Sequence, residues 1–340
     1  MTRIVSASVA RRADFDHSAP DVVAVSRDEW RTGDFVVAEV LASENVPYLV
    51  ETTSGRMAEV APGDRIVGAL GRREATLEVV GDWQKIDDST MQILVPGGVL
   101  GRCTSASVNH RPMADVLYVG HAHLDGRRQT MDGCAVGKAG ERIEAPIVLI
   151  IGTSMDAGKT VAGRAIVREL KRFGARVAGI KVTGVGRYKD ILALRDAGAD
   201  FVADFVDAGL PSTVVPREDF GAALRRLGSA VAESKPDVVV AEAGASPLEP
   251  YNGDEAVREL AERIGFVVLC ASDPYAVVGV MSAFELTPDL ISGRATSTSA
   301  GVELIERLVG VPALNLLEPT GDTLLGDLLD AALGLVAAPP

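Results

Sequence analysis

A short glycine-containing loop in the second half of the chain carries residue types suited to binding phosphate. It runs Gly152-Thr-Ser-Met-Asp-Ala-Gly-Lys-Thr160 and follows the apolar segment 147–151. Glycines let backbone N–H groups converge on phosphate oxygens, and the start of a following helix adds partial positive charge. Lys159 would pair with the β- and γ-phosphates, and the Thr160 hydroxyl would ligate Mg²⁺. We therefore predict that the nucleotide contacts are Gly152, Thr153, Ser154, Met155, Asp156, Ala157, Gly158, Lys159, Thr160 and Val161.

The spacing of the two glycines sets this loop apart from the most common phosphate loops. The pattern is Gly-x5-Gly-Lys-Thr, one residue longer than the usual Gly-x4-Gly-Lys-Thr. A glycine-rich turn with an incidental Lys-Thr pair is the alternative interpretation. The apolar run before the loop and the helical periodicity after it favour a phosphate loop, because such a site needs a strand, a turn and a helix in that order.

Two carboxylates join Thr160 as predicted magnesium ligands. Glu242 follows the apolar run 238–241, where the carboxyl edge of a parallel sheet opens toward ligands. Bound Mg²⁺ keeps several waters and takes one or two carboxylates. Asp190 has two interpretations that the residues leave open, a metal ligand or the N-cap of a helix over 191–197. Asp156, inside the loop, either contacts metal or substrate or stabilises the helix start.

A second lysine, Lys181, ends another apolar segment at the same predicted edge. It would neutralise the transferring phosphate or orient a carboxylate substrate. The alternative is a strand-end lysine whose head reaches solvent. Thr183 and Gly184 follow it, and Ser212 and Thr213 lie in a connecting segment where a plain turn is equally compatible. We predict that these four residues contact substrate and that the catalytic residues are Lys159 and Lys181.

The elements that must position these residues change character near residue 145. Before it, short β-branched runs alternate with Gly, Asp and Pro turns, which predicts a small β-barrel or sandwich. After it, apolar runs alternate with amphipathic helical stretches, which predicts an α/β fold with a doubly wound, mainly parallel sheet. The predicted organisation is a β-rich N-terminal domain over 1–110, a connecting segment over 111–144 with one strand at 116–119, and a P-loop NTPase domain over 145–340.

The strands predicted in the second half span 147–151, 176–182, 238–241, 266–270 and 313–316. Ser292-Gly293-Arg294 follows an apolar pair and is interpreted as a turn, with the lining of a base pocket as the alternative. His121, His123 and Asp125 lack a further ligand at suitable spacing, so a metal site there is not favoured.

The overall composition narrows the class of protein. The chain has 340 residues and a formal net charge of −13, which disfavours broad nucleic-acid binding because phosphate backbones are repelled. Its three cysteines form no Cys-x-x-Cys pair, which favours a reducing cytoplasm. The N-terminus lacks an apolar signal segment, and no apolar run is long enough to span a membrane. We expect a cytoplasmic protein that binds neither nucleic acid nor membrane.

Beyond these physical arguments, the loop GTSMDAGKT resembles that of dethiobiotin synthetases, which share the longer form GT-x4-GKT. Segments 179–184, 190–194 and 238–244 resemble, in the same order, the synthetase's Gly-x-Lys-Pro, Asp-Ala-Leu-Ala-Leu and Glu-Gly-Ala-Gly segments. A second P-loop family is more similar still. It shares GTSM-x-AGKT, KVTG and DAGLPST, and some of its members are linked to N-acetylation of D-glutamate or D-aspartate. The resemblance covers 145–320 and leaves the β-rich region outside.

The resemblance implies an enzyme that uses ATP and Mg²⁺ as a ligase or kinase. Such an enzyme activates a small carboxylate or carbamate by phosphoryl transfer, and Lys159 and Lys181 would stabilise charge while Thr160, Asp190 and Glu242 hold Mg²⁺. Because the synthetase has no N-terminal β-domain, its own substrate is not implied. A homodimer is expected, since related P-loop proteins often complete their sites across a two-fold axis.

Two alternatives stay open. The first is acyl transfer to an amino acid, as in the second P-loop family. The second is a nucleotide-switched adaptor or chaperone that contacts a partner through its β-domain. The sequence holds no Asn/Thr-Lys-x-Asp guanine signature, which favours ATP over GTP.

Overall fold

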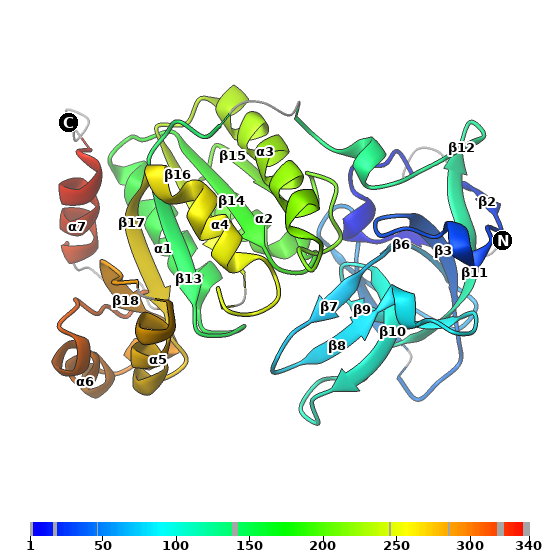
Figure 1. Ribbon diagram of the computed structural model, residues 1–340, viewed down its shortest axis with the longest axis horizontal. Helices are drawn as coiled ribbons and strands as arrows, with labels where there is room; N and C mark the ends of the chain where they lie inside the picture. The colour runs from blue at the N-terminus through cyan, green and yellow to red at the C-terminus, as the bar shows by residue number, and fades with distance from the viewer. Residues whose placement is uncertain are drawn as a thin grey trace. The chain divides into compact units, whose positions relative to one another are not determined.

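The computed structural model describes residues 3–15, 19–45, 47–137, 142–244, 246–284, 286–317 and 323–335. The chain divides into two compact units (Figure 1). The first holds Met1–Gly137 together with Val185–Lys189 and Phe205–Leu227, and the second holds the remaining segments. Two short stretches from the second half of the sequence thus belong to the β-rich unit. The predicted domain boundaries, 1–110, 111–144 and 145–340, stay a prediction.

The first unit is built on a closed ring of strands. The pairing order β6–β3–β11–β9–β10 returns to β6 through an additional β6–β10 pairing, so these strands form a barrel. Closure leaves a barrel without free sheet edges. The strands of this unit are β1 (Ile4–Ser6), β2 (Asp21–Val23), β3 (Phe35–Val40), β4 (Tyr48–Glu51), β5 (Met57–Val60), β6 (Arg65–Leu70), β7 (Arg72–Glu74), β8 (Val79–Asp82), β9 (Thr90–Val95), β10 (Val99–Ala106), β11 (Asp115–Leu124) and β12 (Arg127–Arg128).

Alternating side chains from the ring fill the core of the barrel. Val36, Ile66, Met91 and Leu100 come from four different strands, and none of them is exposed. Strand β11 is much longer than the strand predicted at 116–119. The rest of 111–144 was expected to form a connection. Its pattern is interrupted at Gly120, where the register against β3 shifts and a Cβ atom would lie 2.8 Å from Val22 Cγ1. The bulge hides the alternation from a sequence argument.

The second unit is an α/β layer structure around a six-stranded sheet in the order β15-β14-β16-β13-β17-β18. All five of its strand pairings are parallel. The predicted fold class, an α/β fold with a mainly parallel sheet preceded by a β-rich region, is confirmed. Continuous Val, Ile and Leu runs suit strands covered on both faces. The strands are β13 (Ile147–Gly152), β14 (Val177–Thr183), β15 (Phe201–Asp204), β16 (Val238–Ala243), β17 (Ile264–Cys270) and β18 (Leu290–Ser292).

Helices connect and cover these strands (Figure 1). Three elements were not predicted: the short strands β15 and β18, and α5, which is apolar along its whole length and lacks an amphipathic period. The strand predicted at 313–316 is wrong, since only an isolated bridge joins Ala313 to Ile291. The helices are α1 (Lys159–Arg172), α2 (Tyr188–Asp196), α3 (Arg217–Ser234), α4 (Gly253–Leu260), α5 (Pro274–Phe284), α6 (Ser299–Val309) and α7 (Leu324–Leu333).

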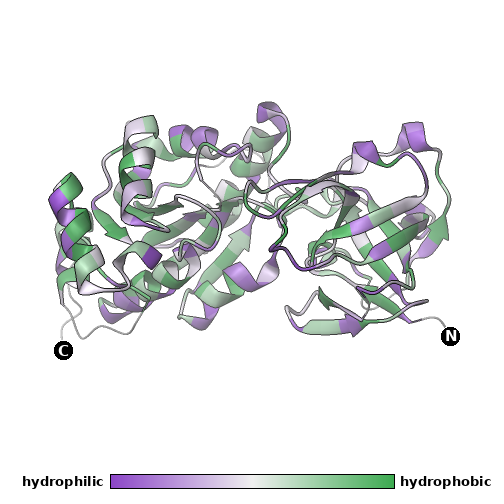
Figure 2. Ribbon diagram, turned by 90° about the horizontal axis from the view of Figure 1, so that it is seen from below, coloured by the Kyte–Doolittle hydropathy of each residue, from purple (hydrophilic) through white to green (hydrophobic). Residues whose placement is uncertain are grey.

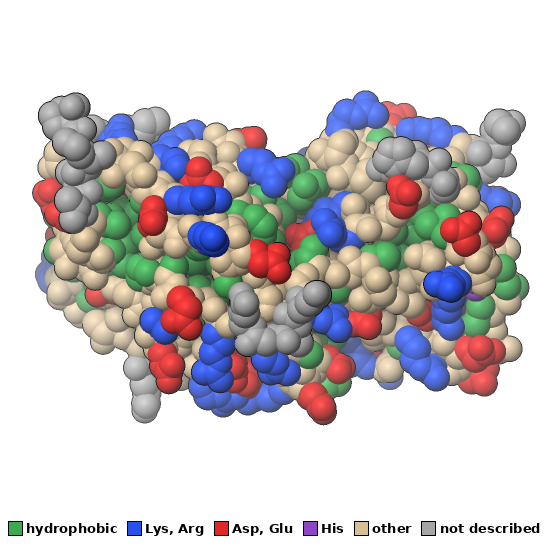
Figure 3. All heavy atoms as spheres, turned by 90° about the horizontal axis from the view of Figure 1, so that it is seen from above, with side chains coloured by type: hydrophobic (Ala, Val, Ile, Leu, Met, Phe, Trp, Pro, Cys, Tyr) green, Lys and Arg blue, Asp and Glu red, His purple; other side chains and the backbone are tan. Residues whose placement is uncertain are grey.

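Hydrophobic and polar residues are distributed differently between strands and helices. Figure 2 shows the strands largely in hydrophobic colours, with polar residues concentrated on helices and connections. On the face seen in Figure 3, basic and acidic side chains are interspersed. Within the described ranges, no helix is both long enough and apolar enough to cross a bilayer.

Candidate functional site

The predicted phosphate loop lies between β13 and α1, at the carboxyl edge of the parallel sheet. Helix α1 begins at Lys159, and Gly158 before it has a φ of +107°, a conformation that favours glycine. The aliphatic stem of Lys159 passes over Gly152, where an added Cβ would lie 2.9 Å from the lysine Cδ. The first glycine of the motif is therefore required because the Lys159 side chain approaches it closely. The second is required because the chain turns there.

The Lys159 ammonium is held by the loop itself. Its side chain is 6% exposed, and Nζ donates a hydrogen bond to the Ser154 carbonyl oxygen at 2.7 Å. Burial lowers the pKa of Lys159, and Glu242 opposes this shift only in part. An anion entering the loop would relieve the desolvation of this cation, which is the electrostatic condition for binding phosphate.

The lengthened loop contains one residue in a left-handed conformation and is contacted by a separate segment of the chain. Asp156 has a φ of +58°, which is uncommon for a residue other than glycine. The Arg294 N–H donates to the Ala157 carbonyl at 3.2 Å, and a Cβ on Gly293 would lie 2.2 Å from that same oxygen. The segment interpreted as a turn at 292–294 therefore packs directly on the predicted phosphate loop.

Thr160 and Glu242 form the part of the site best suited to a magnesium ion. The Thr160 hydroxyl donates to Glu242 Oε2 at 3.0 Å. Glu242 lies on β16 opposite Ile150 of β13 and is 4% exposed. Burial raises the pKa of its carboxyl group, although the Lys181 and Lys159 ammonium groups pull it down. A hydroxyl and a buried carboxylate beside a phosphate loop fit an octahedral Mg²⁺ that takes its other ligands from phosphate and water.

Lys181 lies in register with two acidic residues on the neighbouring strands. Its strand β14 places it opposite Glu242 on one side and Asp204 on the other. Its Nζ donates to Asp190 Oδ2 at 2.5 Å, and the lysine is 6% exposed. Burial lowers the pKa of Lys181, but Asp190 and Glu242 outweigh burial and the net shift is upward. Lys181 is therefore a fixed, fully charged cation at the sheet edge. Asp204, which was not predicted from the sequence as a site residue, is the last residue of β15.

Two glycines leave room for the Lys181 side chain. A Cβ on Gly184 would lie 3.2 Å from Lys181 Cε, and one on Gly244 would lie 3.0 Å from the same atom. Gly184 has a φ of +128°. The Thr183 hydroxyl, fully buried, donates to the Gly244 carbonyl at 3.0 Å, so it joins the ends of β14 and β16.

The structure resolves one of the alternatives for Asp190. Helix α2 begins at Tyr188, so Asp190 is its third residue and does not precede the helix as an N-cap would. Its carboxylate contacts Lys181, whereas Glu242 contacts Thr160. The assignment of Asp190 to magnesium stays a prediction.

The predicted substrate residues fall into different units. Thr183 and Gly184 belong to the unit with the phosphate loop, whereas Ser212 and Thr213 belong to the β-rich unit. Both of the latter are buried, and Ser212 Oγ accepts the Val214 N–H at 3.2 Å. Within the unit that holds Lys181, the structure brings together only the first pair. A substrate role for Ser212 and Thr213 stays a prediction.

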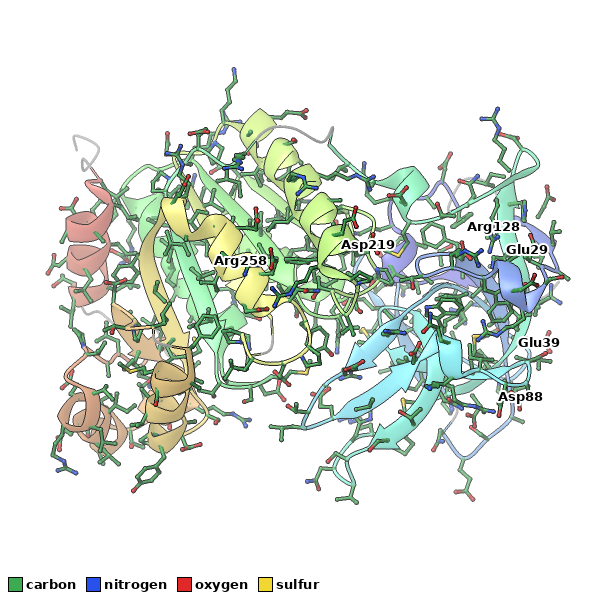
Figure 4. The ribbon with its side chains drawn as sticks, in the orientation of Figure 1. Glu29, Glu39, Asp88, Arg128, Asp219 and Arg258 are labelled. Carbon is green, nitrogen blue, oxygen red and sulfur yellow. The ribbon has the colours of Figure 1, made fainter. Side chains whose placement is uncertain are left out.

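The first histidine of the pair in β11 is surrounded by polar partners. His121 is fully buried, with Nδ1 2.7 Å from the Tyr118 hydroxyl and Nε2 3.3 Å from Asp34 Oδ2. Arg128 also binds Asp34 and donates to the Glu29 carbonyl, and Figure 4 shows these two labelled residues side by side. Across the described part of the chain, no group of three or more His, Cys, Asp or Glu side chains is arranged to hold a metal ion.

Cys270, at the end of β17, provides a direct test of how closed the loop region is. Its thiol is fully buried and its carbonyl accepts the Thr153 N–H at 3.0 Å. Burial raises the pKa of the thiol to about 12, so almost no thiolate exists at pH 8. We expect native Cys270 to resist N-ethylmaleimide at pH 8 and to react after unfolding, as measured by peptide mass spectrometry. Cys103 and Cys134, which are partly exposed, serve as internal controls. Rapid native labelling of Cys270 would contradict the closed packing.

Comparison with known proteins adds only a general likeness. No family model matches the sequence, and a search among curated proteins finds no match. Among solved structures, chloroplast FtsY from Physcomitrella patens is similar at 13% identity and a TM-score of 0.38, over 58% of this chain and 70% of that one. The signal recognition particle receptor FtsY from Elizabethkingia anophelis is similar at 16% identity and a TM-score of 0.38, over 54% and 65%. These values are too low to carry an argument about nucleotide or partner.

Proposed function

We propose that this protein is an ATP- and Mg²⁺-dependent enzyme that transfers a phosphoryl group to a small carboxylate or amino-acid substrate. The observation that carries the proposal is the second buried lysine. Lys181 is fixed by Asp190 and lies in register with Glu242, whose partner Thr160 follows the loop lysine. A protein that only binds nucleotide needs one cation at the phosphates, whereas phosphoryl transfer gains from a second cation placed where charge develops.

The proposed reaction assigns each group a task. A carboxylate oxygen of the substrate attacks the γ-phosphorus, and the bond from that phosphorus to the β,γ-bridging oxygen breaks. ADP leaves with the electron pair, and the product is an acyl phosphate that a nucleophile later opens, releasing phosphate. Lys159 stabilises the phosphate oxygens, and Lys181 orients the substrate carboxylate or the transferring group. Bound Mg²⁺ would neutralise phosphate charge, with Thr160 and Glu242 as its protein ligands.

The test is ADP release measured against panels of carboxylic and amino acids, each with ATP and with GTP. We expect turnover only with ATP, Mg²⁺ and a small substrate, and we expect hydroxylamine to trap the acyl phosphate as a hydroxamate. ATP hydrolysis that no small molecule accelerates would contradict the proposal. Formation of an N-acetylated D-amino acid from acetyl-CoA without ATP would favour the acyltransferase alternative.

One observation favours a nucleotide switch as the second candidate. The segments that follow β14 and β15, Val185–Lys189 and Phe205–Leu227, are grouped with the β-rich unit and not with the sheet. These segments, which leave the sheet at the edge where nucleotide would bind, would then transmit the nucleotide state to that unit. A switch should hydrolyse ATP slowly by itself and faster with a protein partner, and it should not respond to the small-molecule panels.

A further inference from the structure

A buried carboxylate in the β-rich unit is bound to the beginning of helix α2. Glu51, the last residue of β4, has no exposed surface. It accepts a hydrogen bond from the Ser8 hydroxyl at 2.6 Å and from the backbone N–H groups of Tyr188 at 2.7 Å and Lys189 at 3.0 Å. These donors are all uncharged, so the helix start itself stabilises the carboxylate.

This contact replaces a cap that the local sequence does not supply. The residue at the N-cap position of α2 is Arg187, whose side chain is not among those preferred there. Glu51 satisfies two of the N–H groups left without helical partners, and its negative charge complements the positive end of the helix. The carboxylate lies 137 residues away from Tyr188 in the chain. The point at which α2 begins therefore depends on a distant strand.

A second contact holds the same turn through a side chain. The Arg11 guanidinium lies over the Tyr188 ring, 4.5 Å from its centre. Asp207 fixes that guanidinium by two hydrogen bonds, at 3.0 and 2.8 Å, and both charged side chains are largely buried. Backbone and side chain of the first residue of α2 are thus restrained independently.

The residue that follows Lys189 in this turn is Asp190, the partner of Lys181. We propose that Glu51 is a positioning residue of the phosphate site: by fixing the first turn of α2, it holds Asp190 at its 2.5 Å contact with Lys181 Nζ. The effect is transmitted along the chain through a single helical turn. The inference rests on the proposed function.

The first test follows the lysine directly and needs no nucleotide. Glu51→Gln should loosen the Asp190–Lys181 pair, so reductive methylation of Lys181, read by mass spectrometry, should rise to the level seen in Asp190→Asn. Lys159, also buried but held by its own loop, should stay unmodified. Exchange of the Tyr188 and Lys189 amide hydrogens should accelerate in the same variant. Glu59→Gln, an exposed change on β5, is the matched control.

The second test measures ADP release together with ATP affinity. Loss of a group that orients a functional side chain typically costs 10–100-fold in activity. We expect Glu51→Gln to lose roughly tenfold in turnover with little change in ATP affinity, and to add nothing to Asp190→Asn in the double variant. Unchanged turnover, an additive double variant, or equal methylation of Lys159 and Lys181 would overturn the proposal. If the wild type binds no ATP, the proposed function fails, and the methylation pattern still decides the positioning role.

Discussion

Replacing Lys159 with alanine is expected to abolish stabilisation by Mg·ATP while changing the stability of the nucleotide-free protein by about 1 kcal/mol or less. The substitution removes one hydrogen bond to Ser154 and the contact with Gly152, a modest loss. It also removes a buried cation whose pKa is lowered by desolvation, which offsets that loss. With phosphate bound, the same cation has no substitute, so turnover should fall by roughly 10²–10³-fold.

Thermal unfolding with and without Mg·ATP measures the first effect, and ADP release measures the second. Lys85→Ala, at an exposed position, is the matched control and should behave like wild type in both. A Lys159→Ala protein that Mg·ATP stabilises as strongly as wild type would show that the loop does not bind phosphate.

Replacing Glu242 with glutamine should give a more stable protein with a less active site. Burial raises the pKa of this carboxyl group in the folded protein, so the folded state binds its proton more tightly than the unfolded state does. Stability therefore falls as pH rises from the ordinary carboxyl pKa through the raised folded value. Glutamine is never ionised, so the variant should lose this slope and be more stable than wild type at pH 7–8.

The same substitution should weaken the function of the site. A neutral amide is a poorer ligand for Mg²⁺ than a carboxylate, so Glu242→Gln should lose most of the Mg²⁺ dependence of ATP binding and roughly 10²-fold in turnover. Unfolding curves from pH 4 to 9 and ATP titrations check the two effects. Glu233→Gln, exposed on α3, controls for the change of net charge. A variant that is less stable at pH 8 but equally stable at pH 4 would contradict the assignment.

The parts of the site that were predicted share a local signal. Lys181 and Glu242 each end an apolar run, and parallel strands bring such ends to one edge, so their proximity follows from the pattern. The glycine-containing loop between β13 and α1 could likewise be predicted because strand, glycines and helix are consecutive in the sequence. Fold class could be predicted for the same reason, since long buried strands and amphipathic helices alternate along the chain.

The parts that were missed depend on contacts between distant residues or on weak patterns. Asp204 ends a strand of only four residues, and α5 has no polar face to reveal its helical period. Glu51 lies in a region whose pattern indicates only a β-strand, and its partners are backbone N–H groups far along the chain. Backbone donors leave no trace in residue types, so no sequence motif would have found this contact. The role of Asp190 was ambiguous because the helix start was placed after it instead of before it.

The division of the chain into interleaved segments has a consequence for biosynthesis. The β-rich unit takes its last segment from Phe205–Leu227, so a ribosome must have released that stretch before this unit can be completed. The barrel strands are made first, but the polypeptide holding Glu51 has no helix start to bind until Tyr188 emerges. Neither unit is formed by one continuous segment of the chain. Expression of residues 1–144 alone would omit the segments that complete the first unit, and gene fusions that exchange one half for another would cut both.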